Sequence, residues 1–453
     1  MAVKIKEAME LQGLEKQLNH FDQAVREKAL HEINGLVESG QIGTAPVQNA
    51  VNMHCHTFFS FNGYGYSPCA LAWLAKKQGY QAIGIVDFDT LDGVDEFLHA
   101  GEVLGVRGSA GIETRTYLPE FSERVINSPG EPGVSYVMGV GFASAHVPDE
   151  AAPILRDLQS RARNRNQIIV ERVNAFLDPV TIDYEQDVIS LTPGGNVTER
   201  HIVLAYVHAA RRKASNIPAF WAQKLALPLE KIKPLMGDLP KFQDTIRSKL
   251  MKKGGVGYIK PTPDTFPDLE EVNQLITACG AIPTIAWLDG TTPGERDAGE
   301  LFSLLMNKGA AVLNIIPDRN WNIKDDQIKQ EKLTKLYEIV NLARQLDLPL
   351  NVGTEMNRFD SQKIDAFNAD ELQPVRQVFL NGAHFIYGHT MMQRHLGMGY
   401  QSLWAQTHFQ ARKNRNQFFQ GIGYAFPPGE PGIQKLTAVG HESHPSSFLV
   451  ALS

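Results

Sequence analysis

The sequence contains few cysteines and no long hydrophobic run. Its 453 residues include three cysteines, Cys55, Cys69 and Cys279, whose spacing fits neither a zinc finger nor a disulfide framework. We therefore expect reduced thiols. No segment approaches the roughly 18 consecutive apolar residues of a membrane-spanning helix. The N-terminal residues are charged and helical, without the apolar core of a signal peptide. We expect a cytoplasmic protein that does not act at a membrane.

An excess of basic charge is also missing. Lys and Arg number 44 against 50 Asp and Glu, giving a formal net charge of −6. A chain with this balance has no basic surface typical of nucleic-acid binding, so we expect no nucleic-acid partner. Hydrophobic residues make up 43% and charged residues 21% of the chain, as in ordinary globular proteins. The length allows two or three domains, or one barrel of about 250 residues with additions.

The hydrophobic pattern changes along the chain. Residues 1–48 have apolar positions at helical spacing and predict an N-terminal helical hairpin. From residue 49, short apolar runs alternate with helical segments, which is typical of a parallel sheet, closed as a barrel or open. The predicted strands cover 50–53, 82–86, 106–112, 136–142, 281–286, 311–316 and 348–352, with helices at 69–78, 269–279 and 330–346.

A region rich in Arg and Lys interrupts this series. Residues 146–255 have helical periodicity, and we interpret them as a helical insertion that divides the barrel into 49–145 and 256–400. Residues 401–453 show little periodicity and several Pro and Gly residues, so we expect a C-terminal extension that lies on the barrel.

Two histidines at the end of the first predicted strand are the first site candidates. His54 and His56 are two residues apart, and such positions point to the same face of a strand. Both imidazoles could therefore bind one metal ion. The alternative is two unrelated polar residues at a strand end.

Carboxylates stand at the ends of three other apolar runs. These are Asp87, Glu113 and Glu355, and β/α barrels assemble their active sites at the carboxyl ends of strands. Asp87 has the alternative role of capping the following helix. Glu113 and Glu355 are poorer capping residues, and their coincidence with His54 and His56 favours a metal site.

These segments together resemble the PHP (polymerase and histidinol phosphatase) superfamily, and within it phosphoesterases with a helical insertion. The resemblance covers about residues 50–395. His54-Cys-His-Thr, the segment that begins at Asp87, Gly-Ile-Glu113 and the segment that contains Glu355 are similar to its metal-binding motifs, and Arg200-His201 is similar to a motif of the insertion. The resemblance implies an α/β fold, a distorted (β/α)7 TIM-like barrel with an inserted helical subdomain.

The sequence departs from this family at several ligand positions. Family members commonly bind three metal ions. Phe61, Phe88 and Asn357 replace the ligands of one ion, and Tyr136 and Trp287 replace ligands of another. The resemblance therefore implies that two sites are lost. The aromatic replacements predict an apolar mouth suited to a small molecule, or they simply fill the vacated volume.

The remaining ligand set is His54, His56, Glu113 and Glu355. By resemblance it forms one site, with Glu355 in place of the family's Asp, and we expect one divalent ion per chain. Two imidazoles and two carboxylates suit Zn, Mn or Fe. Four ligands either close a structural site or leave positions for water, and a metal-activated water would give hydrolytic chemistry.

Further catalytic candidates lie near these motifs. Asp87 could orient a ligand histidine or act as a general base. Arg200 with His201, and Arg319 after a buried run, could bind phosphate, although a solvated or capping arginine is the alternative for each. His389 could be a ligand or general acid, or a structural histidine. We interpret the insertion's other arginines as a solvated helix face: Arg156, Arg161, Arg163 and Arg165.

The sequence thus predicts a metal-dependent hydrolase of a small molecule, with a phosphate ester as the substrate implied by the resemblance. Two alternatives remain open. One is a catalytically inactive protein of the same fold that binds a ligand or a protein. The other is a mononuclear hydrolase of a non-phosphate bond, such as an amide or a carbohydrate-linked ester.

Overall fold

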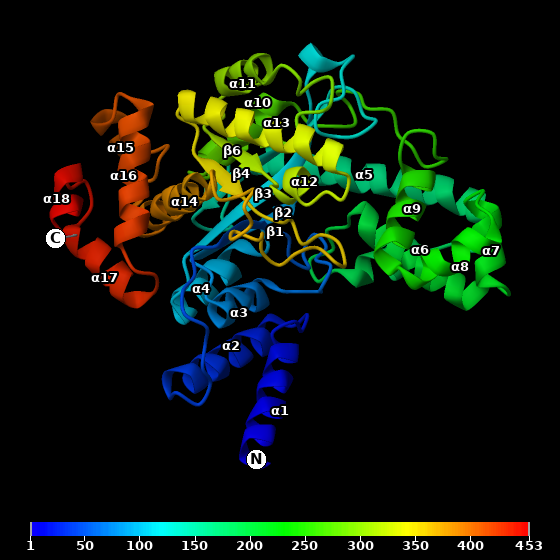
Figure 1. Cartoon of the computed structure of the whole chain (residues 1–453), viewed down its shortest axis with the longest axis horizontal. Coiled ribbons are helices and arrows are strands. Elements are labelled where there is room, and N and C mark those ends of the chain that lie inside the picture. Colours follow the sequence, from blue (N-terminus) through cyan, green and yellow to red (C-terminus); the bar gives the residue numbers. More distant parts are fainter. Residues whose placement is uncertain (1, 452–453) are drawn as a thin grey trace.

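The computed structural model describes residues 2–451 and has a mixed α/β fold around a seven-stranded sheet (Figure 1). The strands lie in sequence order, and a parallel bridge between Cys55 and Glu355 brings the first edge next to the last, so the barrel is nearly closed. The strands are β1 (Val51–Cys55), β2 (Ala82–Phe88), β3 (Gly108–Tyr117), β4 (Val134–Phe142), β5 (Ile282–Trp287), β6 (Val312–Ile315) and β7 (Leu350–Val352).

The expectation of a purely parallel sheet is wrong at β4, which runs antiparallel to both β3 and β5. The chain reaches β4 through residues 118–133, where the 3-10 turn η1 (Pro119–Phe121) stands in place of a crossover helix. A connection without a crossover returns the chain in the opposite direction. The other six strands are parallel, so their carboxyl ends share one edge of the barrel.

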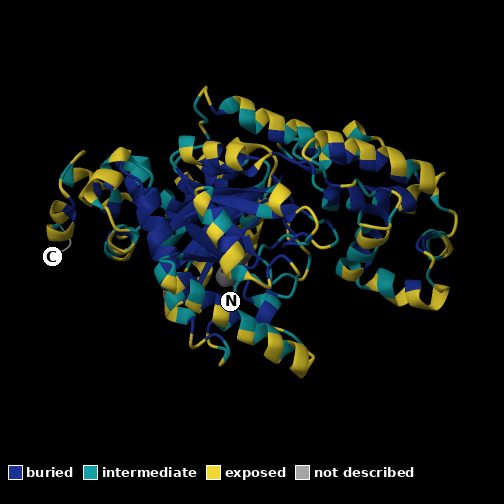
Figure 2. Cartoon of the chain, turned by 90° about the horizontal axis from the view of Figure 1, so that it is seen from above, coloured by how far each residue is buried: buried dark blue, intermediate teal, exposed yellow. Residues whose placement is uncertain are grey.

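Helices cover the outside of the sheet, and the buried centre is apolar (Figure 2). The predicted helices at 69–78, 269–279 and 330–346 are present within a few residues of those bounds. The covering helices are α3 (Pro68–Gln78), α4 (Val94–Leu104), α10 (Leu269–Ala278), α11 (Ala298–Asn307), α12 (Asp318–Trp321), α13 (Asp326–Gln345) and α14 (Arg376–Leu396).

The insertion begins with α5 (Ala152–Leu177), a helix of 26 residues and therefore about 39 Å long. Because β4 is reversed, it ends at the edge opposite to the other strand ends, and α5 carries the chain back along the barrel. The remaining helices enclose a second core around Tyr206, Trp221 and Phe242, to the right of the barrel in Figure 1. They are η2 (Tyr184–Val188), η3 (Ile189–Leu191), α6 (Glu199–Lys213), α7 (Ile217–Lys224), α8 (Leu229–Gly237) and α9 (Leu239–Met251).

The predicted N-terminal hairpin is present as α1 (Ala2–Gln17) and α2 (Gln23–Glu38). Its apolar face joins the barrel core through Leu18, Leu30 and Ile33. A buried ion pair between Arg26 and Glu96 fixes α2 against α4.

The C-terminal extension is helical, contrary to the little periodicity that its sequence shows. It consists of α15 (Leu403–His408), α16 (Arg412–Ala425), α17 (Glu430–Val439) and α18 (Pro445–Val450). Aromatic contacts between Trp404, Phe418 and Phe448 hold these short helices together. Helix α16 packs so closely on α14 that a Cβ atom at Gly388 would lie 1.9 Å from the Phe419 carbonyl oxygen. None of the helices in the described part of the chain has the length and apolar character needed to cross a membrane.

Candidate metal centre

Two strands bring three predicted ligands together at the carboxyl edge of the barrel. His54 lies in β1, and His56 follows the end of that strand. Glu113 lies on β3, which is separated from β1 by β2. The Oε2 atom of Glu113 is 3.4 Å from His54 Nε2 and 3.2 Å from His56 Nε2. All three side chains are buried, and their ligand atoms lie within 4.8 Å of one another. The two-residue spacing of the histidines thus places both rings on one face, as a strand requires.

Hydrogen bonds fix which ring nitrogen of each histidine faces Glu113. His54 Nδ1 lies 3.2 Å from Asn314 Oδ1, an acceptor, so Nδ1 carries the proton. His56 Nδ1 lies 3.1 Å from Ser60 Oγ, and that hydroxyl donates its own proton to Asp87 at 2.6 Å. Nδ1 of His56 is therefore also the donor, which leaves the Nε2 lone pairs of both rings directed at the carboxylate.

Three acceptor atoms consequently face one another without a donor between them. His54 Nε2, His56 Nε2 and Glu113 Oε2 are buried and have no hydrogen-bond partner among the described residues. Unpartnered buried polar atoms are costly, about 1–3 kcal/mol each, so the cluster favours a metal ion or a proton on one imidazole at its centre. Two imidazole nitrogens and a carboxylate oxygen are the ligands that zinc and related divalent ions prefer. The donor set therefore fits a divalent metal ion.

The charges of the group support the same conclusion. Burial raises the pKa of Glu113, but the adjacent His54 and His56 outweigh it and bring that pKa to about 2. For His54, burial lowers the pKa, but Glu113 and Glu355 outweigh burial and raise it above its ordinary value, so without a metal ion a proton on Nε2 would take the place of the cation between this ring and the carboxylate. The site thus keeps an ionised carboxylate and attracts positive charge.

The fourth predicted ligand, Glu355, is engaged differently. Its carboxylate accepts hydrogen bonds of 2.8 and 2.9 Å from Arg319 Nη2. Its backbone lies in the left-handed region, with φ of 61°, and pairs with β1 through the His54 carbonyl and the His56 amide. Burial alone would raise the pKa of Glu355, but Arg319 and His54 hold it below its ordinary value. Glu355 therefore lies at the edge of the group as a carboxylate paired with Arg319.

Two other predicted catalytic residues, Asp87 and Arg200, differ in whether they line the cavity beside the ligand group. Asp87 lies behind His56, where it accepts from Thr57 N, Thr57 Oγ1 and Ser60 Oγ. It orients the loop after β1 and does not line the cavity described below. Arg200 lines that cavity and pairs with Asp244 at 3.1 Å.

Two predicted histidines are used structurally. His201 Nδ1 accepts the Thr198 amide at the start of α6, and burial lowers its pKa to about 3, so it carries no charge at neutral pH. His389 contacts the Gly141 carbonyl with Nε2 and accepts the Tyr400 amide with Nδ1. Both ring nitrogens of His389 are thus occupied, away from the barrel mouth.

A cavity of about 330 Å³ opens between the ligand group and the insertion. Four aromatic residues surround it: Phe61, Phe88, Tyr136 and Trp287 all line its wall. Phe88 also stacks on His56, with ring centroids 4.6 Å apart. The predicted aromatic residues therefore lie beside the ligand group, but they share the cavity with many charged side chains.

Charged residues that were not predicted at the site also line the cavity. Arg165 is buried against Phe266 and donates to the Thr265 carbonyl, so its interpretation as a solvated residue is wrong. On the same helix, Arg156 and Arg163 are exposed and Arg161 is half-buried, whereas Arg165 lines the cavity. The remaining members are Arg115, Glu199, Arg247 and Lys252. Arg115 could have been recognised, because it lies two residues after Glu113 on the same strand.

Comparisons with known proteins give weak structural likenesses. A solved amidohydrolase from Chromobacterium violaceum, with bound sulfate and no metal, is 13% identical at a TM-score of 0.47, over 70% of this chain and 92% of that one. A protein from Bifidobacterium adolescentis, assigned as a metal-dependent phosphoesterase, is 18% identical at a TM-score of 0.46, over 74% of this chain and 98% of that one. Likeness at this level does not establish a shared activity. No protein-family model and no curated protein matches the sequence.

Proposed function

We propose that this protein is a metal-dependent hydrolase that binds one divalent ion through His54, His56 and Glu113 and acts on a phosphate ester. The observation that carries the proposal is the convergence of three buried, unpartnered acceptor atoms beside a cavity. Such an ion supplies Lewis acidity to the attacked group and activates water. The Nδ1 hydrogen bonds to Asn314 and Ser60 keep both imidazoles in the orientation that this binding needs.

The charge of the cavity supports an anionic substrate. Six cationic side chains and four carboxylates line it, and two of the cations, Arg115 and Arg200, also pair with the carboxylates of Glu131 and Asp244 outside the lining. The cations are Arg115, Arg165, Arg200, Arg247, Lys252 and Arg319. Arginine offers a planar fork of donors that matches phosphate oxygens.

Arg319 is the cation best placed to orient the substrate next to the ligand group. One of its nitrogens holds Glu355, and the guanidinium also lines the cavity. We assign it the binding of the phosphate, with the aromatic residues Tyr136 and Trp287 contacting the organic part of the ester.

The test is hydrolysis by protein reconstituted with Zn²⁺, Mn²⁺ or Fe²⁺. A panel of aryl phosphates, carboxylic esters and amides is assayed with the wild type, His54→Ala and Glu113→Gln. His146→Ala, at an exposed histidine, is the matched control. We expect phosphate release that is lost in the first two variants and kept in the control.

Other outcomes decide between the alternatives. Turnover of esters or amides alone would replace the phosphate substrate by a non-phosphate bond. Metal binding without any turnover would indicate a binding protein, and phosphate release that persists in His54→Ala would contradict the proposed site.

A further inference from the structure

A second group of metal-ligating side chains lies outside the cavity, between the N-terminal hairpin and the barrel. Glu27 and His31 are on α2, and His99 is on α4. Their ligand atoms all lie within 4.8 Å of one another. The rings of His31 and His99 are edge to face, with centroids 5.9 Å apart.

The arrangement follows from helix geometry. Glu27 and His31 are four residues apart, so they share one face of α2. His99 meets that face from the adjacent helix. Zinc binds imidazole nitrogen at about 2.0–2.1 Å and carboxylate oxygen at about 2.0–2.2 Å, which small side-chain rotations would satisfy here. None of the three side chains is buried, so these rotations are free.

The side chains of Glu27, His31 and His99 are available to bind a ligand. Within the described part of the chain, none of the three takes part in a hydrogen bond or an ion pair through its side chain. The nearby lysine of α2, Lys28, pairs with Glu32 at 3.8 Å. Two imidazoles and a carboxylate are thus free to bind a cation.

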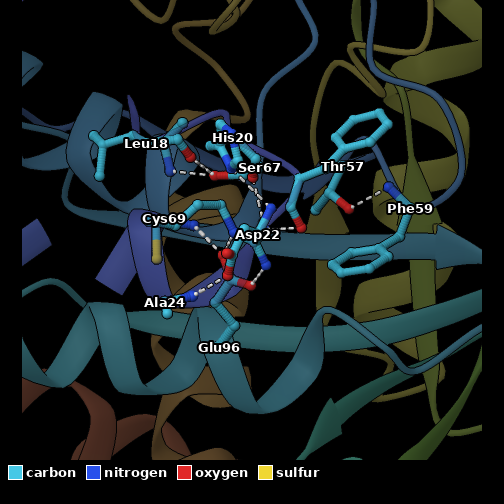
Figure 3. A network of polar contacts seen from close by, with 12 residues as sticks. Leu18, His20, Asp22, Ala24, Thr57, Phe59, Ser67, Cys69 and Glu96 are labelled. Carbon is cyan, nitrogen blue, oxygen red and sulfur yellow. Dashed lines mark hydrogen bonds and ion pairs between the residues drawn. The ribbon is translucent and has the colours of Figure 1, made fainter. Parts of the chain in front are cut away.

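A neighbouring contact holds the two helices in register. Arg26 Nε donates to Glu96 Oε1 at 2.8 Å, and its Nη1 donates to the carbonyl oxygens of His20 and Phe21. Figure 3 shows Glu96 reaching from α4 towards the start of α2. Arg26 is next to Glu27 and Glu96 is one turn before His99, so this buried pair fixes the distance across which the proposed ligands face each other.

We propose that Glu27, His31 and His99 form a zinc site that fastens the N-terminal hairpin to α4. Water completes the coordination, because the group lies at the surface. The bound ion would cross-link two elements that are otherwise joined by packing and a few polar contacts. This site is independent of the proposed hydrolase activity, and its role is structural.

The experiment counts zinc by isothermal titration after chelator treatment. The full-length wild type is compared with His31→Ala, His99→Ala and the control His146→Ala. We expect each of the first two variants to bind one zinc ion fewer than the wild type and the control, whatever the central site binds. All three histidines are at the surface, so the variants keep the fold.

Hydrogen exchange supplies a second readout of the cross-link. At a free zinc concentration about ten times the dissociation constant, opening of α2 should become about tenfold rarer. Amide exchange in α2 should slow by that factor in the wild type and in His146→Ala, and remain unchanged in His31→Ala.

Three results would overturn the proposal. The first is equal zinc stoichiometry in all four proteins. The second is slowing of α2 exchange by zinc in His31→Ala. The third is zinc loss in the variants with no effect of zinc on α2 exchange in the wild type, since the bound ion would then fasten nothing. Hydrolase activity, measured in parallel, is expected to be equal in all four.

Discussion

The two walls of the cavity satisfy their polar atoms in different ways. At the barrel edge, His54, His56 and Glu113 direct three acceptors at one point and leave them without a donor. At the insertion, Glu199 accepts from Arg247 at 2.7 Å and from Lys252 at 2.9 Å. The second wall is complete as an ion network, whereas the first is complete only with a cation from outside the chain. The group at the barrel edge is therefore the candidate ligand set, whereas the ion pairs of Glu199 are structural.

The largest expected effect comes from removing a ligand at the barrel edge. In Glu113→Gln, an amide replaces the ionised carboxylate between the two Nε2 atoms. A metal ion contributes several kcal/mol to transition-state stabilisation, so we expect a loss of about 1000-fold in kcat/KM. The measurement is steady-state hydrolysis at saturating metal. Activity within tenfold of the wild type would show that the carboxylate binds no catalytic ion.

Breaking the network at the insertion should change stability. In Glu199→Gln, the half-buried cations Arg247 and Lys252 lose their main partner, and the expected cost lies between the about 0–1 kcal/mol of a surface pair and the about 3–5 kcal/mol of a fully buried one. The free energy of unfolding in urea measures this cost. Glu300→Gln is the control, because its partner Arg124 is at the surface and such pairs contribute about 0–1 kcal/mol. Equal midpoints for both variants would contradict a structural role of the network.

The next prediction concerns Arg319, which pairs with Glu355 beside the ligand group and lines the cavity. We expect Arg319→Met to lower kcat/KM about 10- to 100-fold, since a hydrogen bond to a charged group contributes about 1.5–3 kcal/mol. Arg358→Met is the matched control, because Arg358 pairs with Asp360 and does not line the cavity. Similar kinetics for both variants would remove Arg319 from substrate binding.

The smallest effect concerns a buried carboxylate outside both walls. Burial raises the pKa of Asp365 from its ordinary value of 3.8 to about 7, against a hydrogen bond from Trp321 and with added repulsion from Asp318. The folded chain therefore holds a proton that the unfolded chain releases, and the free energy of unfolding falls as pH rises from about 4 to about 7.

Asp365→Asn should remove this dependence, because an amide stays neutral. Its Tm relative to the wild type should rise by about 2 °C or more between pH 5 and pH 8. Asp370→Asn, at an exposed position, is the control. A constant difference in Tm across this range would mean that Asp365 is ionised in the folded protein.

The sequence was most informative where a local pattern determines geometry. The apolar runs predicted the strands, and the spacing of His54 and His56 predicted two rings on one face. The antiparallel direction of β4 could not be predicted, because it depends on a connection without a helix. The burial of Arg165 and the pairing of Arg319 with Glu355 depend on contacts between distant segments, which single-sequence periodicity does not contain.

The central claim is that His54, His56 and Glu113 bind a divalent ion. The most direct measurement is X-ray diffraction from crystals grown with Zn²⁺ or Mn²⁺, with data collected on both sides of the metal absorption edge. Our account predicts an anomalous peak between the two Nε2 atoms and the Glu113 carboxylate. Full metal loading in the crystal with no anomalous peak at this point would contradict it.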